Sequence, residues 1–187
     1  RKSGCVNVGF SLESGNKEIL EMMDKKIDPE DFDESIRILR LAGITFNTSV
    51  VFGYPIETPE TIQQTFDQCA RNELFPSIGI LLPLPYTPMY EYAKDHGYIT
   101  DEDIFLTEIT ERQDICLNMT QMSDDELLNK IQQCAESLNE QLGVNLADVF
   151  RTGGERRHTK RMNMSADEDR LRRNENDFSF SYSDATF

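Results

Sequence analysis

Apolar residues form three short runs in the first 90 positions, and each run ends in a polar or proline-rich turn. In the first run Val6, Val8, Phe10 and Leu12 alternate with small or polar residues. The second and third runs, residues 44–52 and 77–82, are rich in β-branched side chains. Alternation and β-branching are typical of strands, so we expect strands at residues 6–12, 44–52 and 77–82.

Segments with helical spacing separate these strands. Asp28 before Pro29 and Thr58 before Pro59 are typical helix starts, because the side chain accepts backbone N–H bonds and proline fits the first turn. A Ser123 to Glu126 capping box starts a longer apolar-faced segment. We expect helices at residues 16–23, from 28 to 43, after 58, at 89–96 and at 123–142, with irregular structure between 98 and 122.

The alternation of strands and helices predicts an α/β fold with parallel strands joined by right-handed crossovers. The carboxyl ends of all three strands should then lie on one side of the sheet, where ligands bind in such folds. Glu13 and Ser14 follow the first strand directly, and Gly53 follows the second. A carboxylate and a hydroxyl can hydrogen-bond to hydroxyls and to an ammonium group, so this edge is the candidate site.

Charge and composition narrow the class of partner. The 187 residues include 19 basic and 34 acidic side chains, a net charge of -15, which repels a long polyanion and disfavours nucleic acid. The sequence has no apolar run near the roughly 20 residues of a membrane span and no signal-peptide pattern. We therefore expect a cytoplasmic protein without a membrane span.

The four cysteines are too far apart for a CxxC or CxxxCxxC loop, so the sequence offers no self-contained zinc or iron–sulfur site. Cys69 and Cys134 fall on apolar helix faces, where we expect them to pack as small hydrophobic residues. The chain starts without an initiator Met shortly before a strand, and we expect it to be a fragment of a longer fold. From Arg151 onward aliphatic residues are few, and we expect residues 151–187 to be a disordered tail.

Three segments together resemble a known family. VNVGFSLESGNKEILEMMDKKI, VVFGYPIETPETIQQT and LLPLPYTPMYEYAKDHGYI resemble the later half of the barrel of radical S-adenosylmethionine (SAM) enzymes, most closely the subgroup that often carries a cobalamin-binding domain ahead of the barrel. The resemblance spans about residues 4–142. It implies half of a TIM-type barrel in residues 1–100, followed by a helical extension in residues 101–150.

The resemblance also implies a set of SAM contacts. The ESG strand end of this family lies beside the ribose and methionyl parts of SAM, the GxP strand end packs near adenine, and the proline-rich turn offers backbone groups to the adenine edge. The residues at the matching positions are Glu13, Ser14, Val51, Gly53, Leu82 and Pro83.

The cofactors that the resemblance implies are SAM and a 4Fe-4S cluster whose ligands lie outside this chain, with cobalamin when an upstream domain is present. The implied partners are a small-molecule substrate, lipid-like or tetrapyrrole-like, and an electron donor such as flavodoxin or ferredoxin. The implied reaction is radical chemistry such as methyl transfer or ring or carbon modification.

Two positions depart from the family pattern. Ile56 and Tyr86 stand where the family commonly has glycine, and a tyrosine at the second position should narrow that part of the pocket. We expect Tyr86 and Tyr90 to pack the turn onto the following helix, with substrate contact as the alternative.

Three other interpretations stay open. The chain could be a noncatalytic homologue with the same fold. In a different TIM-barrel enzyme Glu13 would act as a general acid or base, although His96 and His158 are the only histidines available as partners. In an interaction module Glu13 and Ser14 would only cap the helix that starts at Asn16.

Overall fold

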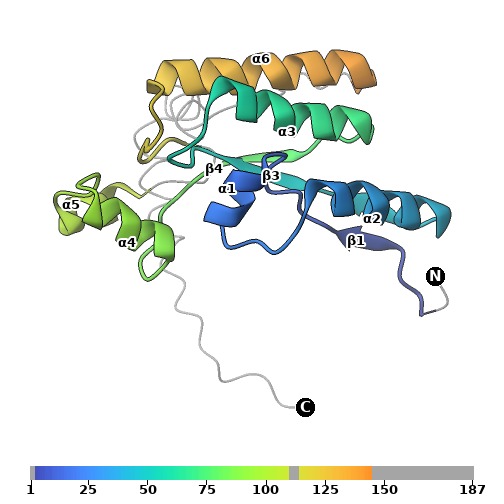
Figure 1. Ribbon diagram of the computed structural model, residues 1–187, viewed down its shortest axis with the longest axis horizontal. Helices are drawn as coiled ribbons and strands as arrows, with labels where there is room; N and C mark the ends of the chain where they lie inside the picture. Colours follow the sequence, from blue (N-terminus) through green and yellow to red (C-terminus); the bar gives the residue numbers. More distant parts are fainter. Residues whose placement is uncertain (1–2, 110–113, 145–187) are drawn as a thin grey trace, which may run out of the picture. The chain divides into compact units, whose positions relative to one another are not determined.

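The computed structural model describes residues 3–109 and 114–144, and Figure 1 shows the order of the elements. The predicted tail, residues 151–187, lies outside the described residues. The strands are β1 (Asn7–Gly9), β2 (Thr45–Asn47), β3 (Ser49–Phe52) and β4 (Ser77–Ile80). The helices are α1 (Lys17–Met22), α2 (Pro29–Leu41), α3 (Pro59–Arg71), α4 (Pro88–Asp95), α5 (Glu102–Glu108) and α6 (Asp124–Leu142).

The strands pair in parallel, as the sequence predicted. β1 lies beside β2 and β3 lies beside β4. The predicted strand 44–52 is divided at Thr48, whose hydroxyl accepts the Leu12 backbone N–H at 3.0 Å while its carbonyl accepts the Ser77 N–H at 2.9 Å. The Thr48 hydroxyl thus takes the place of a backbone carbonyl as the acceptor for Leu12. Backbone pairing between residues 6–13 and β3 resumes at a bridge between Glu13 and Val50. The described residues form an α/β fold, part of a TIM-type barrel.

The first strand segment carries one extra residue before its end. From Gly9 to Glu13 the chain advances by four positions, whereas from Asn47 to Val50, their partners, it advances by three. This mismatch is a β-bulge, and bulges redirect the side chains that follow them. Glu13 is then fixed in place, because its N–H donates to the Ser49 carbonyl at 3.0 Å and its carbonyl accepts the Val51 N–H at 2.9 Å.

The predicted helix starts at Asp28, Thr58 and Ser123 are confirmed, and each side chain accepts a backbone N–H in the first turn. The short helix α5 was not predicted. Asp101 caps it through the Ile104 N–H at 3.0 Å. Its apolar Ile104 is exposed and only Phe105 is buried, so its sequence shows no apolar stripe.

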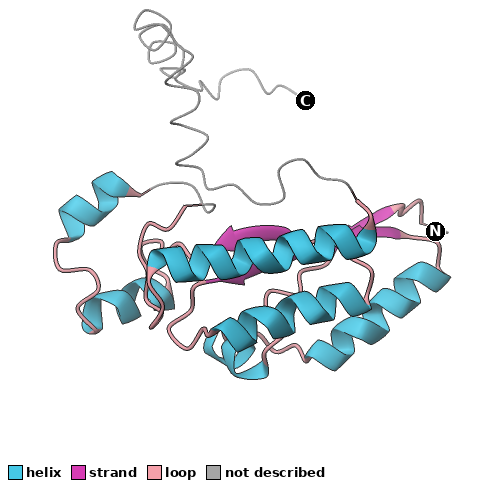
Figure 2. Cartoon of the chain, turned by 90° about the horizontal axis from the view of Figure 1, so that it is seen from above, coloured by secondary structure: helices cyan, strands magenta, loops and turns pink. Residues whose placement is uncertain are grey.

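Helices α2, α3 and α6 run beside one another along the sheet (Figure 2). Their inward side chains share one core with alternate residues of β3 and β4. Cys69 and Cys134 are buried in this core, as predicted. Its buried members are Leu12, Phe32, Ile36, Val50, Phe52, Ile62, Phe66, Cys69, Ile78, Ile80, Leu127, Ile131, Cys134, Ala135 and Leu138.

A second apolar cluster covers the carboxyl ends of the strands. Ile19 of α1, Leu81 just after β4 and Phe105 of α5 meet there with Tyr54 and Tyr90. Apart from Val51, the residues of β3 and β4 that alternate with the first core are small or polar, and Ser49 hydrogen-bonds to Ser11 across the strands at 2.8 Å. In a TIM-type barrel this polar strand face is the interior face.

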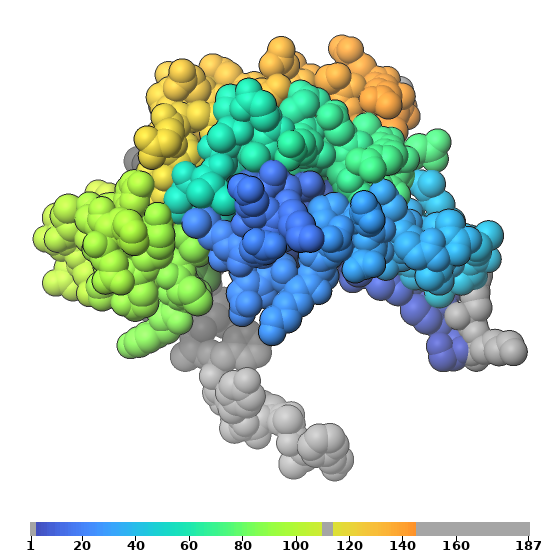
Figure 3. Space-filling model, in the orientation of Figure 1, coloured from blue at the N-terminus to red at the C-terminus, as the bar shows by residue number. Residues whose placement is uncertain are grey.

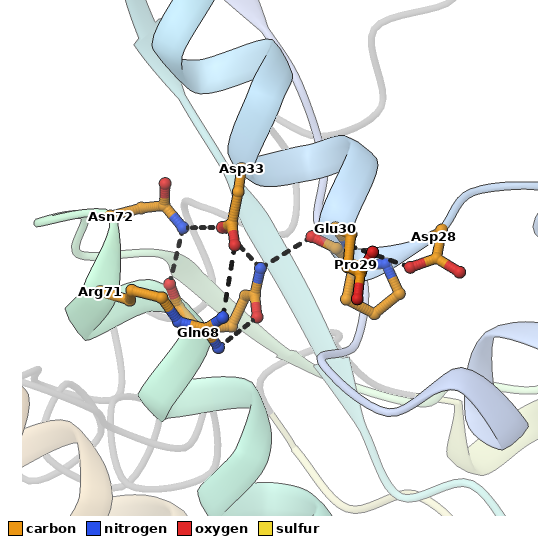
Figure 4. Close-up of polar contacts among 7 residues, drawn as sticks. All are labelled: Asp28, Pro29, Glu30, Asp33, Gln68, Arg71 and Asn72. Atoms are coloured by element: carbon orange, nitrogen blue, oxygen red, sulfur yellow. Dashed lines mark hydrogen bonds and ion pairs between the residues drawn. The ribbon is translucent and has the colours of Figure 1, made fainter.

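Asp33 is the centre of a polar network that joins α2 to α3 (Figure 4). Its carboxylate accepts hydrogen bonds from Gln68 at 2.7 Å and from the Asn72 amide, and it lies 3.3 Å from the Arg71 guanidinium. Gln68 also donates to the Pro29 carbonyl at 2.8 Å. The network fixes the start of α2 against the end of α3.

Asp33→Ala should lower the free energy of unfolding by about 1–2 kcal/mol, because the amides of the buried residues Gln68 and Asn72 each lose an acceptor. Urea unfolding measures this cost. Asp31→Ala, an exposed change on the same helix, serves as the control and should cost less than about 0.5 kcal/mol. Equal costs for the two variants would show that the network contributes nothing.

Candidate cofactor-binding site

The three strand ends each carry a residue with positive φ. Glu13 has φ 63°, Gly53 has φ 101° and Tyr86 has φ 67°. The two other described non-glycine residues with positive φ, Asp24 and Glu73, follow the ends of α1 and α3, where such a conformation is common. Glu13 does not follow a helix, so a helix end does not explain its left-handed backbone. Non-glycine residues with left-handed backbone cluster at functional sites.

Glu13 presents its carboxylate at the end of the first strand segment. Its side chain is 17% exposed, and Oε1 lies 3.0 Å from Nζ of Lys25. Lys25 follows α1, and its backbone N–H closes that helix on the Leu20 carbonyl at 2.9 Å. The carboxylate is therefore held in one position while part of it stays open to a ligand.

Ser14 and Gly15 anchor the turn to α3. The buried Ser14 hydroxyl accepts the Asn16 N–H at 3.1 Å, and the Gly15 N–H donates to the Thr65 hydroxyl at 2.9 Å. In Figure 3 the blue surface of this turn and of α1 lies against the teal surface of α3. The cap of α1 is Asn16, whose side chain accepts the Ile19 N–H at 3.1 Å, and Ser14 holds the backbone of this cap residue.

The other expected contacts come together on the neighbouring strands. Val51 is half-buried on β3, and Gly53 follows it with a buried, left-handed backbone. The Phe52 carbonyl accepts the Leu81 N–H at 2.7 Å, so the turn after β4 starts directly beside the turn after β3. Leu82 is half-buried and Pro83 is buried, both within that second turn.

Sequence reasoning missed Glu57 as a residue with special electrostatics. Glu57 lies in the turn between β3 and α3 and is only 2% exposed. The Thr61 hydroxyl donates to its Oε1, whereas Oε2 has no hydrogen-bond partner among the described residues. Burial raises the pKa of the Glu57 carboxyl to about 7. The one sequence signal was a carboxylate immediately before the helix cap Thr58.

Tyr54 lies near both acidic side chains. Burial, and then the charges of Glu13 and Glu57, raise the pKa of the Tyr54 phenol to about 12. The phenol is therefore protonated at neutral pH and available as a hydrogen-bond donor beside the two carboxyl groups.

The described residues do not fit an iron–sulfur cluster. In residues 3–109 and 114–144 there is no group of three or more potential metal-ligating side chains. Burial raises the pKa of the Cys69 thiol to about 12, so Cys69 is a poor metal ligand at neutral pH. The strand ends instead offer a carboxylate, left-handed backbone and a half-buried valine.

In that same part of the chain every helix is too short or too polar to cross a membrane.

Comparison with known proteins relates the first part of the chain to one family. Residues 1–69 match the family model of the radical SAM superfamily. The chain is 29% identical over 108 residues to a bacteriochlorophyllide d C-12(1)-methyltransferase of Chlorobaculum tepidum, covering 57% of this chain and 24% of that protein. The first 69 residues are therefore similar to the radical SAM superfamily.

Two other relatives carry different names. A tRNA-2-methylthio-N(6)-dimethylallyladenosine synthase of Finegoldia magna is 34% identical over 65 residues, which are 34% of this chain and 14% of that protein. An anaerobic magnesium-protoporphyrin IX monomethyl ester cyclase of Cereibacter sphaeroides is 26% identical over 104 residues, 54% of this chain and 17% of that protein. The chain spans about a fifth of the length of the curated relatives it matches.

Proposed function

We propose that this chain supplies the SAM-positioning strand ends of a radical SAM enzyme. The observation that carries the proposal is the placement of Glu13, Gly53 and the turn after β4 at one edge of a parallel sheet, in a chain whose first 69 residues are similar to this superfamily. SAM bound to a 4Fe-4S cluster supplies radical chemistry in such enzymes. The cluster ligands would be residues outside this chain, since its four cysteines lack CxxxCxxC spacing.

Each strand end has a distinct role in this proposal. Glu13 accepts hydrogen bonds from the SAM ammonium group or ribose hydroxyls, and Lys25 holds its carboxylate in place. Val51 and Gly53 give an apolar, closely approaching surface for adenine, and Leu82 and Pro83 offer backbone groups to the adenine edge. Ser14 shapes the turn through its contact with the Asn16 N–H. These residues bind and orient SAM.

We further propose a cytoplasmic enzyme acting on a small molecule with a tetrapyrrole-like ring. Two of the relatives reported above are named for tetrapyrrole substrates, and the net charge of -15 disfavours the tRNA for which another is named. The proposal includes a flavodoxin or ferredoxin as electron donor. It also includes cobalamin, bound by an upstream domain, for a methyl-transfer reaction.

The acid–base interpretation of Glu13 gains no support from its surroundings. The ion-pair partner of Glu13 is Lys25, while His96 stacks on Tyr92 at the end of α4. His158 lies outside the described residues.

Glu13→Gln should weaken SAM binding roughly tenfold to a hundredfold, because a charge-assisted hydrogen bond contributes on the order of 1.5–3 kcal/mol. Equilibrium binding of SAM to the cluster-loaded enzyme measures the effect, and the thermal midpoint is recorded in parallel. Glu34→Gln is the matched control, since it removes a carboxylate paired with Arg37 on the exposed side of α2. A lower midpoint with unchanged SAM affinity would assign Glu13 to the fold alone.

A further inference from the structure

Tyr86 occupies a backbone position that suits glycine. The Thr87 N–H donates to the Leu84 carbonyl at 3.1 Å, Pro85 lies at the second position of this turn and Tyr86, with φ 67°, lies at the third. This is the pattern of a type II turn, whose third residue needs a positive φ and is usually glycine. A bulky aromatic residue in this conformation is strained.

Packing does not compensate for this strain. The Tyr86 side chain is 97% exposed, whereas Tyr90 is 2% exposed in the second apolar cluster. The expectation that both tyrosines pack the turn onto the helix is therefore confirmed for Tyr90 and wrong for Tyr86. The backbone of Tyr86 is strained, and its aromatic ring is exposed in the turn after β4, beside the candidate site. A strained residue that adds no packing points to a role in binding rather than in stability.

Two other apolar side chains are exposed on the turns at this edge. Ile56, after β3, is 39% exposed, and Leu84, after β4, is 48% exposed. Residues 82–88 carry no charged side chain, in a chain where 28% of residues are charged. We call Ile56, Leu84 and Tyr86 the apolar rim. Because β3 and β4 are paired in parallel, the rim borders the turns that hold Gly53 and Pro83.

We propose that Tyr86 is a specificity-determining residue that stacks on a flat conjugated ring of the substrate, with Ile56 and Leu84 flanking the ring edge. This inference rests on the proposed function, since it places the substrate beside the SAM contacts. An exposed aromatic face gains most from a second flat π-system, and aliphatic neighbours suit an apolar ring rather than a sugar or a phosphate. The acidity of the chain favours a free small molecule over a stacked RNA base.

Protoporphyrin IX is a suitable probe, because it is flat, conjugated and detectable by absorbance. Tyr86→Trp adds a tryptophan at this position, and a stacked porphyrin should quench the fluorescence that the variant has in excess of the wild type. Tyr86→Gly should weaken porphyrin binding about fivefold to tenfold. The same variant should raise the thermal midpoint by about 2–4 °C, because glycine relieves the positive φ. Leu41→Ala, at a 75% exposed apolar position on α2, is the control and should change neither quantity.

The combination of lower affinity and higher stability supports the proposal, because a residue that only supports the fold would lower the stability when removed. Equal porphyrin affinity in the wild type and Tyr86→Gly, or no porphyrin binding by the wild type, would overturn it. Binding of an RNA stem–loop that depends on Tyr86, without porphyrin binding, would overturn the substrate class. SAM affinity is measured on the same samples of the cluster-loaded enzyme. If Tyr86→Gly leaves porphyrin affinity unchanged while Glu13→Gln still weakens SAM binding, this inference fails and the proposed function stands. If the wild type does not bind SAM, the proposed function itself fails.

Discussion

Raising the pH from about 4.5 to about 7.5 should make Glu57 a destabilising residue. Burial raises the pKa of its carboxyl from 4.5 in the unfolded chain to about 7 in the fold. Between these values the folded state binds more protons than the unfolded state, so stability falls as the pH rises. Below pH 4.5 the group is protonated in both states and has no effect. Above pH 7 the full penalty applies, about 3 kcal/mol.

The measurement is urea unfolding of the wild type and of Glu57→Gln at several values between pH 4.5 and 7.5. Exposed carboxyls such as Glu34 and Glu126, whose pKa values are lowered by their partners, change the stability mainly below pH 4.5, and equally in both proteins. The difference between wild type and variant isolates Glu57, and it should change by about 3 kcal/mol across this range in favour of the amide. A difference that stays constant with pH would show that Glu57 is ionised in the fold at all of these values.

Gly15→Ala should destabilise the protein by about 3 kcal/mol or more, since both obstructing groups are backbone. A Cβ at Gly15 would lie 2.7 Å from the Thr65 Cα and 2.8 Å from the Gln64 carbonyl oxygen, so α3 or the turn must move. Such a movement also displaces Ser14, and through it Glu13, so SAM affinity should fall with stability.

Gly9→Ala is the control for this substitution, because its Cβ would meet only the Asn47 side chain, at 4.0 Å. Its free energy of unfolding should stay within about 0.5 kcal/mol of the wild type. Chemical denaturation of the two variants gives both values. A tolerated Gly15→Ala, within 1 kcal/mol of the control, would contradict the tight contact between the turn and α3.

The local signals in the sequence were sufficient for the strand direction and for the helices other than α5. Asp28, Thr58 and Ser123 each act on backbone groups a few residues away, so their pattern determines a helix start without help from the rest of the chain. The crossover rule then determined the parallel pairing of β3 with β4.

The details of the site depend on contacts between distant segments. Thr48 interrupts a strand because its hydroxyl reaches Leu12, 36 positions earlier, and the bulge before Glu13 follows from that pairing. Ser14 was expected at the ligand, but its burial depends on Thr65, which no local pattern links to it. The burial of Glu57 and the exposure of Tyr86 likewise depend on how the turns fold onto the sheet.

Photo-crosslinking tests most directly the central claim, that these strand ends hold SAM. SAM with an azide on its adenine ring is bound to the cluster-loaded enzyme and irradiated, and the labelled peptides are identified by mass spectrometry. The account predicts labels at residues 51–53 and 82–83, suppressed by an excess of unmodified SAM. Specific labels confined to other segments, with none at either strand end, would contradict it.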